Sequence, residues 1–230
     1  YVEVPVSKLI SKSYGSRMRE SINPDSAGSS ELINDWMESS ETTHYSIIDR
    51  FGNAVSATIT LNGSYGSKVV VKGAGFLMNN EMDDFSIKPG IPNMYGLVGG
   101  RANEIAPAKR MLSSMAPTIV LRDGEVFMIL GSPGGSTIIT SVAQVIINVI
   151  DFRMEPEDAV SYPRFHHQYL PDMIYHEEGA FADRLEKQLM NRGHKLKARS
   201  PIGDIQLIIK KGGAACGYTD PRLCGSAVSA

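Results

Sequence analysis

The sequence predicts an α+β protein, and three observations lead to this prediction. Apolar runs at 42–50, 54–61, 119–130 and 205–210 have the length and side-chain pattern of β-strands. A stripe of apolar residues between 138 and 150 has the spacing of a helix. Paired strands that are separated by helical segments are typical of folds in which sheets and helices form layers.

Composition limits the function. The 230 residues are 42% hydrophobic and 21% charged, which fits one large globular domain or two small ones. The formal net charge of −2 argues against a nucleic-acid partner, because such binding needs a concentrated basic face. The most apolar stretch, 142–150, is far shorter than the roughly 20 residues of a membrane helix, so we expect no membrane span.

The first 41 residues are more polar and loop-like in sequence than the rest of the chain. The chain opens at Tyr1 without an initiator Met or a signal region, and we interpret it as starting within a longer protein. A short helix is expected after Pro5, followed by an open polar loop at 23–30 and a second polar patch at 38–41. Such a segment is exposed and easily cleaved.

The first predicted hairpin runs over 42–50 and 54–61. If its loop is centred on Gly52, Thr42 faces Asn62 and lies diagonal to Thr60 on the same sheet face. This register would gather two hydroxyls and a carboxamide behind a cleavable loop. Threonine is also simply a good strand residue, so the pairing alone favours no function.

The second hairpin, 119–130, turns at Asp123-Gly124, a pair that suits a type I′ turn. The glycine-rich segment 131–136 then leads into the helix, and its N–H groups suit an anion or an oxyanion. It lacks the spacing of a phosphate loop or of a nucleophile elbow. Further on we expect a helix entered at Pro156, a helix over 180–192 and a strand over 205–210.

Several groups of polar residues can each be interpreted in two ways, as part of a site or as ordinary structure. The acidic run 79–85 suits a cation or a substrate ammonium, but is equally typical of a solvated loop. Buried hydroxyls at Ser113-Ser114 would need partners, of which a ligand carboxylate is one. The histidines 166, 167 and 176 lack the cysteines or carboxylates of a zinc spacing, so neither metal nor cofactor is expected. Cys216 and Cys224 are compatible with a disulfide or with two free thiols.

Seven short motifs, taken in order, resemble the small subunit of the γ-glutamyltranspeptidases. They are Thr42-Thr43-His44-Tyr45-Ser46, Thr60-Leu61-Asn62, Leu77-Met78-Asn79-Asn80-Glu81-Met82-Asp83-Asp84-Phe85, Pro92-Asn93-Met94-Tyr95-Gly96-Leu97-Val98-Gly99-Gly100, Lys109-Arg110-Met111-Leu112-Ser113-Ser114-Met115, Gly131-Ser132-Pro133-Gly134-Gly135-Ser136 and Pro163-Arg164-Phe165-His166-His167. The resemblance covers most of the chain from Thr42 to about Arg222, and residues 4–7 resemble the end of the family's large subunit.

The resemblance implies an N-terminal nucleophile hydrolase, a four-layer αββα sandwich made as a precursor that cleaves itself before a threonine. By motif the cut falls between Glu41 and Thr42, so that 1–41 is the tail of the large subunit and 42–230 the catalytic small subunit. The freed α-amine, with a reference pKa of about 7.7 to 8.0, would serve as the base for the Thr42 hydroxyl. The implied activity is cleavage of the γ-glutamyl amide of glutathione and related compounds through a γ-glutamyl ester of Thr42, which water or an amino-acid or peptide amine then resolves.

The resemblance also assigns roles to side chains. Thr60 would orient the nucleophile, and backbone N–H groups of Gly134 and Gly135 would bind the oxyanion. The substrate's charged groups and the pocket's lid would involve Asn62, Glu81 and Asp84 at the α-ammonium, Ser113 and Ser114 at the α-carboxylate, and Tyr95 in the lid.

The chain also departs from the family pattern. Met111 stands where the family usually has proline, and Thr137 where it often has arginine. An arginine of the large subunit, which pairs with the substrate carboxylate in the family, has no counterpart here, so the large subunit of the precursor is an expected partner. The family further implies a periplasmic, secreted or cell-surface enzyme.

Three alternatives stay open. The same fold could act on poly-γ-glutamate or on a β-lactam side chain. The chain could instead be an uncleaved homologue that only binds ligands. An ordinary serine hydrolase, using His44 or a Ser64 to Lys68 segment, lacks a supporting signature.

Overall fold

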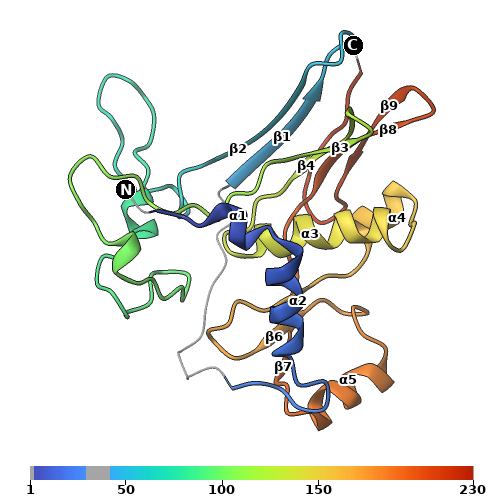
Figure 1. Ribbon diagram of the computed structural model, residues 1–230. Coiled ribbons are helices and arrows are strands. Elements are labelled where there is room, and N and C mark those ends of the chain that lie inside the picture. Colours follow the sequence, from blue (N-terminus) through green and yellow to red (C-terminus); the bar gives the residue numbers. More distant parts are fainter. Residues whose placement is uncertain (1–2, 30–41, 230) are drawn as a thin grey trace.

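The computed structural model (Figure 1) describes residues 3–29 and 42–229 and confirms the α+β class. Within these residues the strands form three sheets: β1 (Thr42–Ile48) with β2 (Ala54–Thr60); β3 (Thr118–Arg122), β4 (Glu125–Gly131), β8 (Gln206–Lys211) and β9 (Ala214–Thr219); and β5 (Phe165–His166), β6 (Ile174–His176) and β7 (Leu196–Ala198). The α-helices are α1 (Val6–Leu9), α2 (Lys12–Glu20), α3 (Thr137–Ile150), α4 (Pro156–Ser161) and α5 (Asp183–Asn191).

Two sheets and a helical layer stack on one another. The hairpin β1–β2 packs against β4 and β8 on one face of the four-stranded sheet, whereas α3 and α4 cover the other face (Figure 1). Met128 and Leu130 of β4 point into the core beneath α3, and the alternation of side chains along a strand turns Ile129 to the opposite face. The described residues thus supply helix, sheet and sheet in that order.

The apolar stripe of α3 is narrower than its sequence indicates. Ile138, Val142 and Val145 are buried against the four-stranded sheet, but Ile139 and Ile150 are exposed. Each residue advances about 100° around a helix, so positions 139 and 150 turn away from the sheet that buries 138, 142 and 145. The predicted helical stripe is thus present, but Ile139 and Ile150 at its margin stay exposed.

The register of the first hairpin also differs from the prediction. Thr42 pairs with Thr60, not with Asn62, and Ile48 pairs with Ala54. The connecting loop is centred on residue 51, because the Asp49 carboxylate accepts hydrogen bonds from the N–H groups of Phe51 and Asn53 and closes a five-residue loop, 49–53. In the observed register, the hydroxyl-bearing residues Thr42 and Thr60 lie directly opposite each other.

The second hairpin forms as predicted. Asp123 and Gly124 both have positive φ, 53° and 85°, as a type I′ turn requires, and Arg122 pairs with Glu125. The later helix is shorter than expected, Asp183–Asn191, and the strand expected at 205–210 is β8. Its partner β9 and the short strands β5 to β7 have no clear signal in the sequence.

The helical segment after Pro5 consists of two helices instead of one. The first ends at Leu9, and Ser11 caps the second, since its hydroxyl accepts a hydrogen bond from the N–H of Tyr14. Cys216 is partly buried and Cys224 is exposed, and both are free thiols. Among the described residues, no helix is long and apolar enough to cross a membrane.

The outer face of β1–β2 carries apolar side chains that are exposed in the described part of the chain. Its exposed side chains alternate with the inward-facing Thr42, His44 and Ser46, as strand geometry requires. They are Tyr45, Ile47, Val55 and Ile59.

Candidate active site

Thr42 is the first residue of β1 and lies almost fully buried, with 7% of its surface exposed. Its Oγ1 donates a hydrogen bond at 3.1 Å to the Oγ1 of Thr60, the residue that pairs with Thr42 across the hairpin. Thr60 Oγ1 in turn accepts the N–H of Asn62 at 2.8 Å. The hydroxyl of Thr42 is thus held in one direction by a neighbour that is itself fixed by the backbone.

Asn62 and Tyr95 connect this pair to the loop that follows residue 92. Asn62 has a φ of 71°, a left-handed conformation that asparagine tolerates well, and its carbonyl accepts the Tyr95 hydroxyl at 2.6 Å. Tyr95 is 4% exposed, and its ring lies against Gly135. Asn62 is therefore bonded to Thr60, and Tyr95 is joined to this pair through Asn62.

The glycine-rich turn presents unused N–H groups. Gly134 and Gly135 have φ of 129° and 53°, in the region that favours glycine. Ser114 Oγ donates to the carbonyl of Gly135 at 3.0 Å, and the Thr137 N–H bonds the carbonyl of Gly134 at 3.0 Å. Among the described residues, no hydrogen bond takes up the N–H of Gly134 or Gly135. The turn can therefore offer donors to an anion.

Glu81 and Asp84 form a carboxyl pair on one 3₁₀ turn, Glu81–Asp84. Burial, followed by the charge of Asp84, raises the pKa of Glu81 to about 7. Burial likewise raises the pKa of Asp84, while its hydrogen bond with Glu81 opposes the shift. Two carboxyls that are buried side by side retain a proton near neutral pH until a cation replaces it.

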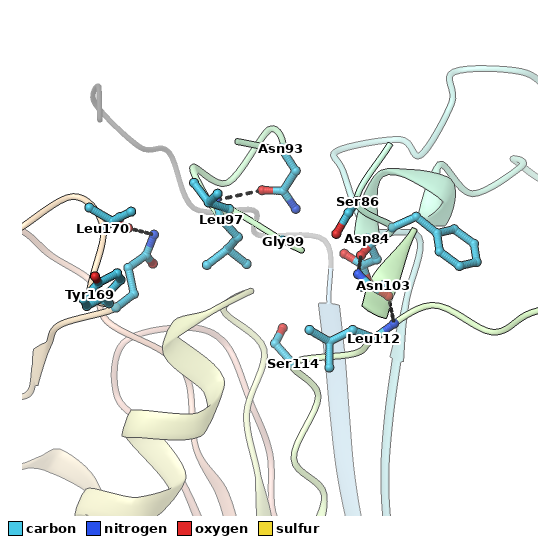
Figure 2. Close-up of a pocket in the computed structure, with 13 residues that line it drawn as sticks. Asp84, Ser86, Asn93, Leu97, Gly99, Asn103, Leu112, Ser114, Tyr169 and Leu170 are labelled. Carbon is cyan, nitrogen blue, oxygen red and sulfur yellow. Dashed lines mark hydrogen bonds between the residues drawn. The ribbon is translucent and has the colours of Figure 1, made fainter. Parts of the chain in front are cut away.

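A cavity of about 300 Å³ adjoins these groups (Figure 2). Asp84 and Ser86 lie on one side of it, Tyr169 and Leu170 on the other, and Asn93 and Leu97 between them above Ser114. Of the predicted site residues, Asp84 and Ser114 line the cavity. Thr42 does not line the cavity. It is connected to Ser114, which does, by successive contacts through Thr60, Asn62, Tyr95 and Gly135.

Ser113 does not line the cavity. Ser113 is exposed, and its Oγ accepts the N–H of Met115 at 3.2 Å instead of lining the cavity. Glu41 lies outside the described residues, and so does the bond that was predicted to be cut.

His44, to which the sequence gave a role only in the serine-hydrolase alternative, lies between the two sheets two residues after Thr42. Its Nδ1 lies 2.8 Å from Thr58 Oγ1, and its Nε2 lies 3.2 Å from Ser46 Oγ, which donates to the carbonyl of Ile129. Burial lowers the pKa of His44 to about 4, so the ring is neutral at physiological pH. A Cβ at Gly131 would stand 2.2 Å from the ring, so only glycine permits this approach.

The serine-hydrolase alternative finds little support in these positions. The Ser46 hydroxyl that His44 touches is directed to a backbone carbonyl between the sheets. Ser64 and Lys68 are both exposed, on the loop between β2 and the acidic turn. Across residues 3–29 and 42–229, no group of three His, Cys, Asp or Glu side chains could hold a metal ion.

The stacked antiparallel sheets, the helices on one outer face and the threonine at the first position of a strand define an N-terminal nucleophile hydrolase. Comparisons with known proteins agree with this class. The whole chain, residues 1–230, matches the family model of gamma-glutamyltranspeptidase. The chain therefore belongs to the gamma-glutamyltranspeptidase family.

Three relatives illustrate the similarity. A glutathione hydrolase proenzyme of Pseudomonas aeruginosa is 48% identical over 225 residues, 96% of this chain and 40% of that protein. A Thr-to-Ala variant of Helicobacter pylori gamma-glutamyltranspeptidase is 55% identical with a TM-score of 0.76, over 79% of this chain and 100% of that one. A cephalosporin acylase of Bacillus halodurans is 26% identical with a TM-score of 0.79, over 96% of this chain and 39% of that one. The chain thus spans about two fifths of the curated relatives' length.

Proposed function

We propose that residues 42–230 are the catalytic small subunit of a self-cleaving γ-glutamyl hydrolase and transpeptidase, and that residues 1–41 are the tail of its large subunit. The single observation that carries the proposal is the Thr42 hydroxyl, buried at the first position of β1 and held by Thr60 at 3.1 Å. Residues 42–230 make up about four fifths of the chain, close to the share that the H. pylori chain matches in full.

The geometry supports the following chemistry. Cleavage after Glu41 would turn the Thr42 amide into a free amine, which takes the hydroxyl proton as Oγ1 attacks the γ-carbonyl. The N–H groups of Gly134 and Gly135 would stabilise the oxyanion. As the amide breaks, the leaving amine takes the proton and a γ-glutamyl ester of Thr42 remains, which water or another amine then attacks. Glutathione and related γ-glutamyl compounds are the proposed substrates, and amino acids or peptides the acceptors.

The other polar groups would hold the two charges of the glutamyl moiety. Asn62, Glu81 and Asp84 would bind its α-ammonium, because carboxylates and amide oxygens in a partly dry pocket suit a cation. Ser114, together with Ser113 after a small loop movement, would donate to its α-carboxylate, and Tyr95 would cover the pocket. The remaining part of the precursor would supply the arginine for the carboxylate and cover the apolar face of β1–β2. We also propose the periplasm or the cell exterior as the location, on the family resemblance.

The test uses the purified full-length protein. N-terminal sequencing after gel separation should find a chain that begins at Thr42, and the cleaved protein should hydrolyse a chromogenic γ-glutamyl anilide. An intact chain without turnover would favour the binding homologue. Faster cleavage of poly-γ-glutamate, or of an acylated β-lactam, than of glutathione would favour the rival substrates.

The Glu81–Asp84 pair predicts a pH dependence of substrate binding. Because the α-ammonium needs the ionised pair, and because the pKa of Glu81 is about 7, we expect KM for the γ-glutamyl donor to rise as pH falls below 7. The rise should be at most about tenfold per pH unit. In Glu81→Gln this rise should flatten, whereas the exposed Glu125→Gln should retain it. A pH-independent KM in the unaltered enzyme would contradict the assignment.

A further inference from the structure

We propose that Gln168 is a positioning residue that holds the loop carrying Tyr95 closed over the cavity, and thereby sets how tightly a γ-glutamyl substrate is retained. The inference rests on the proposed function for its substrate, but on separate contacts for its geometry. Gln168 lies in the loop after β5, and neither the motifs nor the roles assigned above include it.

The side chain of Gln168 bonds four groups. Its Nε2 donates to the carbonyl of Leu170 at 3.0 Å and to the carbonyl of Tyr95 at 3.3 Å. Its Oε1 accepts the Ser136 hydroxyl at 2.6 Å and lies 3.1 Å from His166 Nε2. Both amide hydrogens and both lone pairs of the oxygen are thus used, so the amide has a single satisfactory orientation.

His166 helps to fix the orientation of the Gln168 amide. An amide oxygen only accepts, so His166 Nε2 must carry the hydrogen, which leaves Nδ1 to accept the Thr140 hydroxyl at 2.8 Å. His166 is 2% exposed, and burial lowers the pKa of its ring, which favours this neutral form. Gln168 is therefore anchored to α3 directly through Ser136, its N-cap residue, and indirectly through His166 and Thr140.

Besides the bond to Asn62, the bond from Gln168 also holds Tyr95 in place. The hydroxyl end of Tyr95 is bonded to Asn62, beside the nucleophile, and its backbone carbonyl is bonded to Gln168. Gln168 also lines the cavity, on whose far wall Asp84 lies (Figure 2). The side chain of Gln168 thus joins the Tyr95 loop, the 168–170 loop and Ser136, which directly follows Gly134 and Gly135.

This arrangement predicts an effect on retention and not on chemistry. Gln168 bonds neither Thr42 nor the N–H groups of Gly134 and Gly135, so the attack itself should proceed without it. Loss of the bond to Tyr95 should increase the open fraction of the loop, and one hydrogen bond amounts to about a fivefold change in an equilibrium. KM should rise and kcat should stay.

The decisive variant is Gln168→Glu in the full-length, cleaved protein. The carboxylate keeps the shape and can still accept from Ser136 and His166, but it cannot donate to the carbonyls of Tyr95 and Leu170. We expect KM for a γ-glutamyl anilide to rise about fivefold, with kcat within about twofold. Amide hydrogen exchange of residues 93–97 should become faster.

Gln144→Glu is the matched control. Gln144 also clamps β5 to α3, since it donates to the carbonyl of Phe165 at 2.8 Å and accepts its N–H at 3.1 Å, but it does not contact the Tyr95 loop. Its KM and its exchange at 93–97 should match the unaltered protein. Should Gln168→Glu fail to fold, Gln168→Ala removes the same two donors without adding charge.

The outcomes separate this inference from the proposed function. Unchanged KM and unchanged exchange at 93–97 in a folded Gln168 variant would overturn the positioning role, and so would a fall in kcat alone. If the unaltered protein hydrolyses no γ-glutamyl compound, the proposed function fails. Faster exchange in Gln168→Glu but not in Gln144→Glu would then still support the closure of the loop.

Discussion

Replacing Thr42 with alanine is expected to abolish both cleavage of the precursor and turnover of γ-glutamyl substrates. The hydroxyl that Thr60 holds at 3.1 Å is the proposed nucleophile for both reactions, and no other group can replace its covalent bond to the acyl carbon. We expect kcat to fall by at least about 10³-fold. Gel analysis of the precursor and a γ-glutamyl anilide assay measure the two losses separately.

Thr43→Ala is the matched control. Thr43 has the same chemistry on the same strand but points to the exposed face, opposite Ile59, so cleavage and turnover should persist. Thr42→Ser should retain reduced activity, because serine keeps the hydroxyl but loses the methyl group that restricts χ1. Turnover at the original rate in Thr42→Ala would identify another nucleophile and revive the serine alternative.

Local chemistry explains which parts of the fold the sequence could predict. The Asp123-Gly124 turn requires two positive φ angles that these residues adopt readily, so the turn of the second hairpin could be placed to the residue. The predicted pairing of the first hairpin is off by two residues, Asn62 instead of Thr60 opposite Thr42, because the side chain of Asp49 closes a loop centred one residue earlier, and such an interaction leaves no periodic pattern. Strands β5 to β7 are two or three residues long, too short for any period to emerge.

The candidate site shows the same division. Motif order predicted that Thr42, Thr60, Asn62 and Tyr95 belong to one site, and the structure brings these four together. The structural contacts of His44 and Gln168 could not be predicted in this way, because they involve segments far along the chain. His44 is bonded to its own hairpin but stands against Gly131, and Gln168 is bonded to residues 73 positions earlier and 32 positions earlier.

The largest expected effect on stability comes from Arg164, at the centre of a buried network of two arginines and two carboxylates. Arg164 is 2% exposed, and its Nη2 lies 2.5 Å from Asp220 Oδ2. Glu177 accepts the N–H of Arg164, and Arg222 bonds both Glu177 and Asp220. The network therefore ties the end of β9 to the start of β5 and the end of β6.

Arg164→Met should reduce the free energy of unfolding by about 3 to 5 kcal/mol, the typical cost of breaking a buried ion pair from one side. The guanidinium cannot lose its charge, so its removal leaves Asp220 and Glu177 with one cation between them. The carbonyl of Ile202, which accepts from Nη1 at 2.8 Å, also loses its donor. Denaturant unfolding of the full-length protein measures the change, with the extent of cleavage matched between samples.

A double-mutant cycle distinguishes the loss of the charge pair from the loss of packing. Asp220→Leu added to Arg164→Met should cost less than the two single changes together, because the second substitution removes the charge that the first one stranded. Lys211→Met is the surface control: Lys211 pairs with Glu155 at 2.6 Å, but both side chains are largely exposed, so stability should not change measurably. Additive costs in the cycle would mean that the two side chains act through packing alone, and the buried charges would then have no stabilising role of their own.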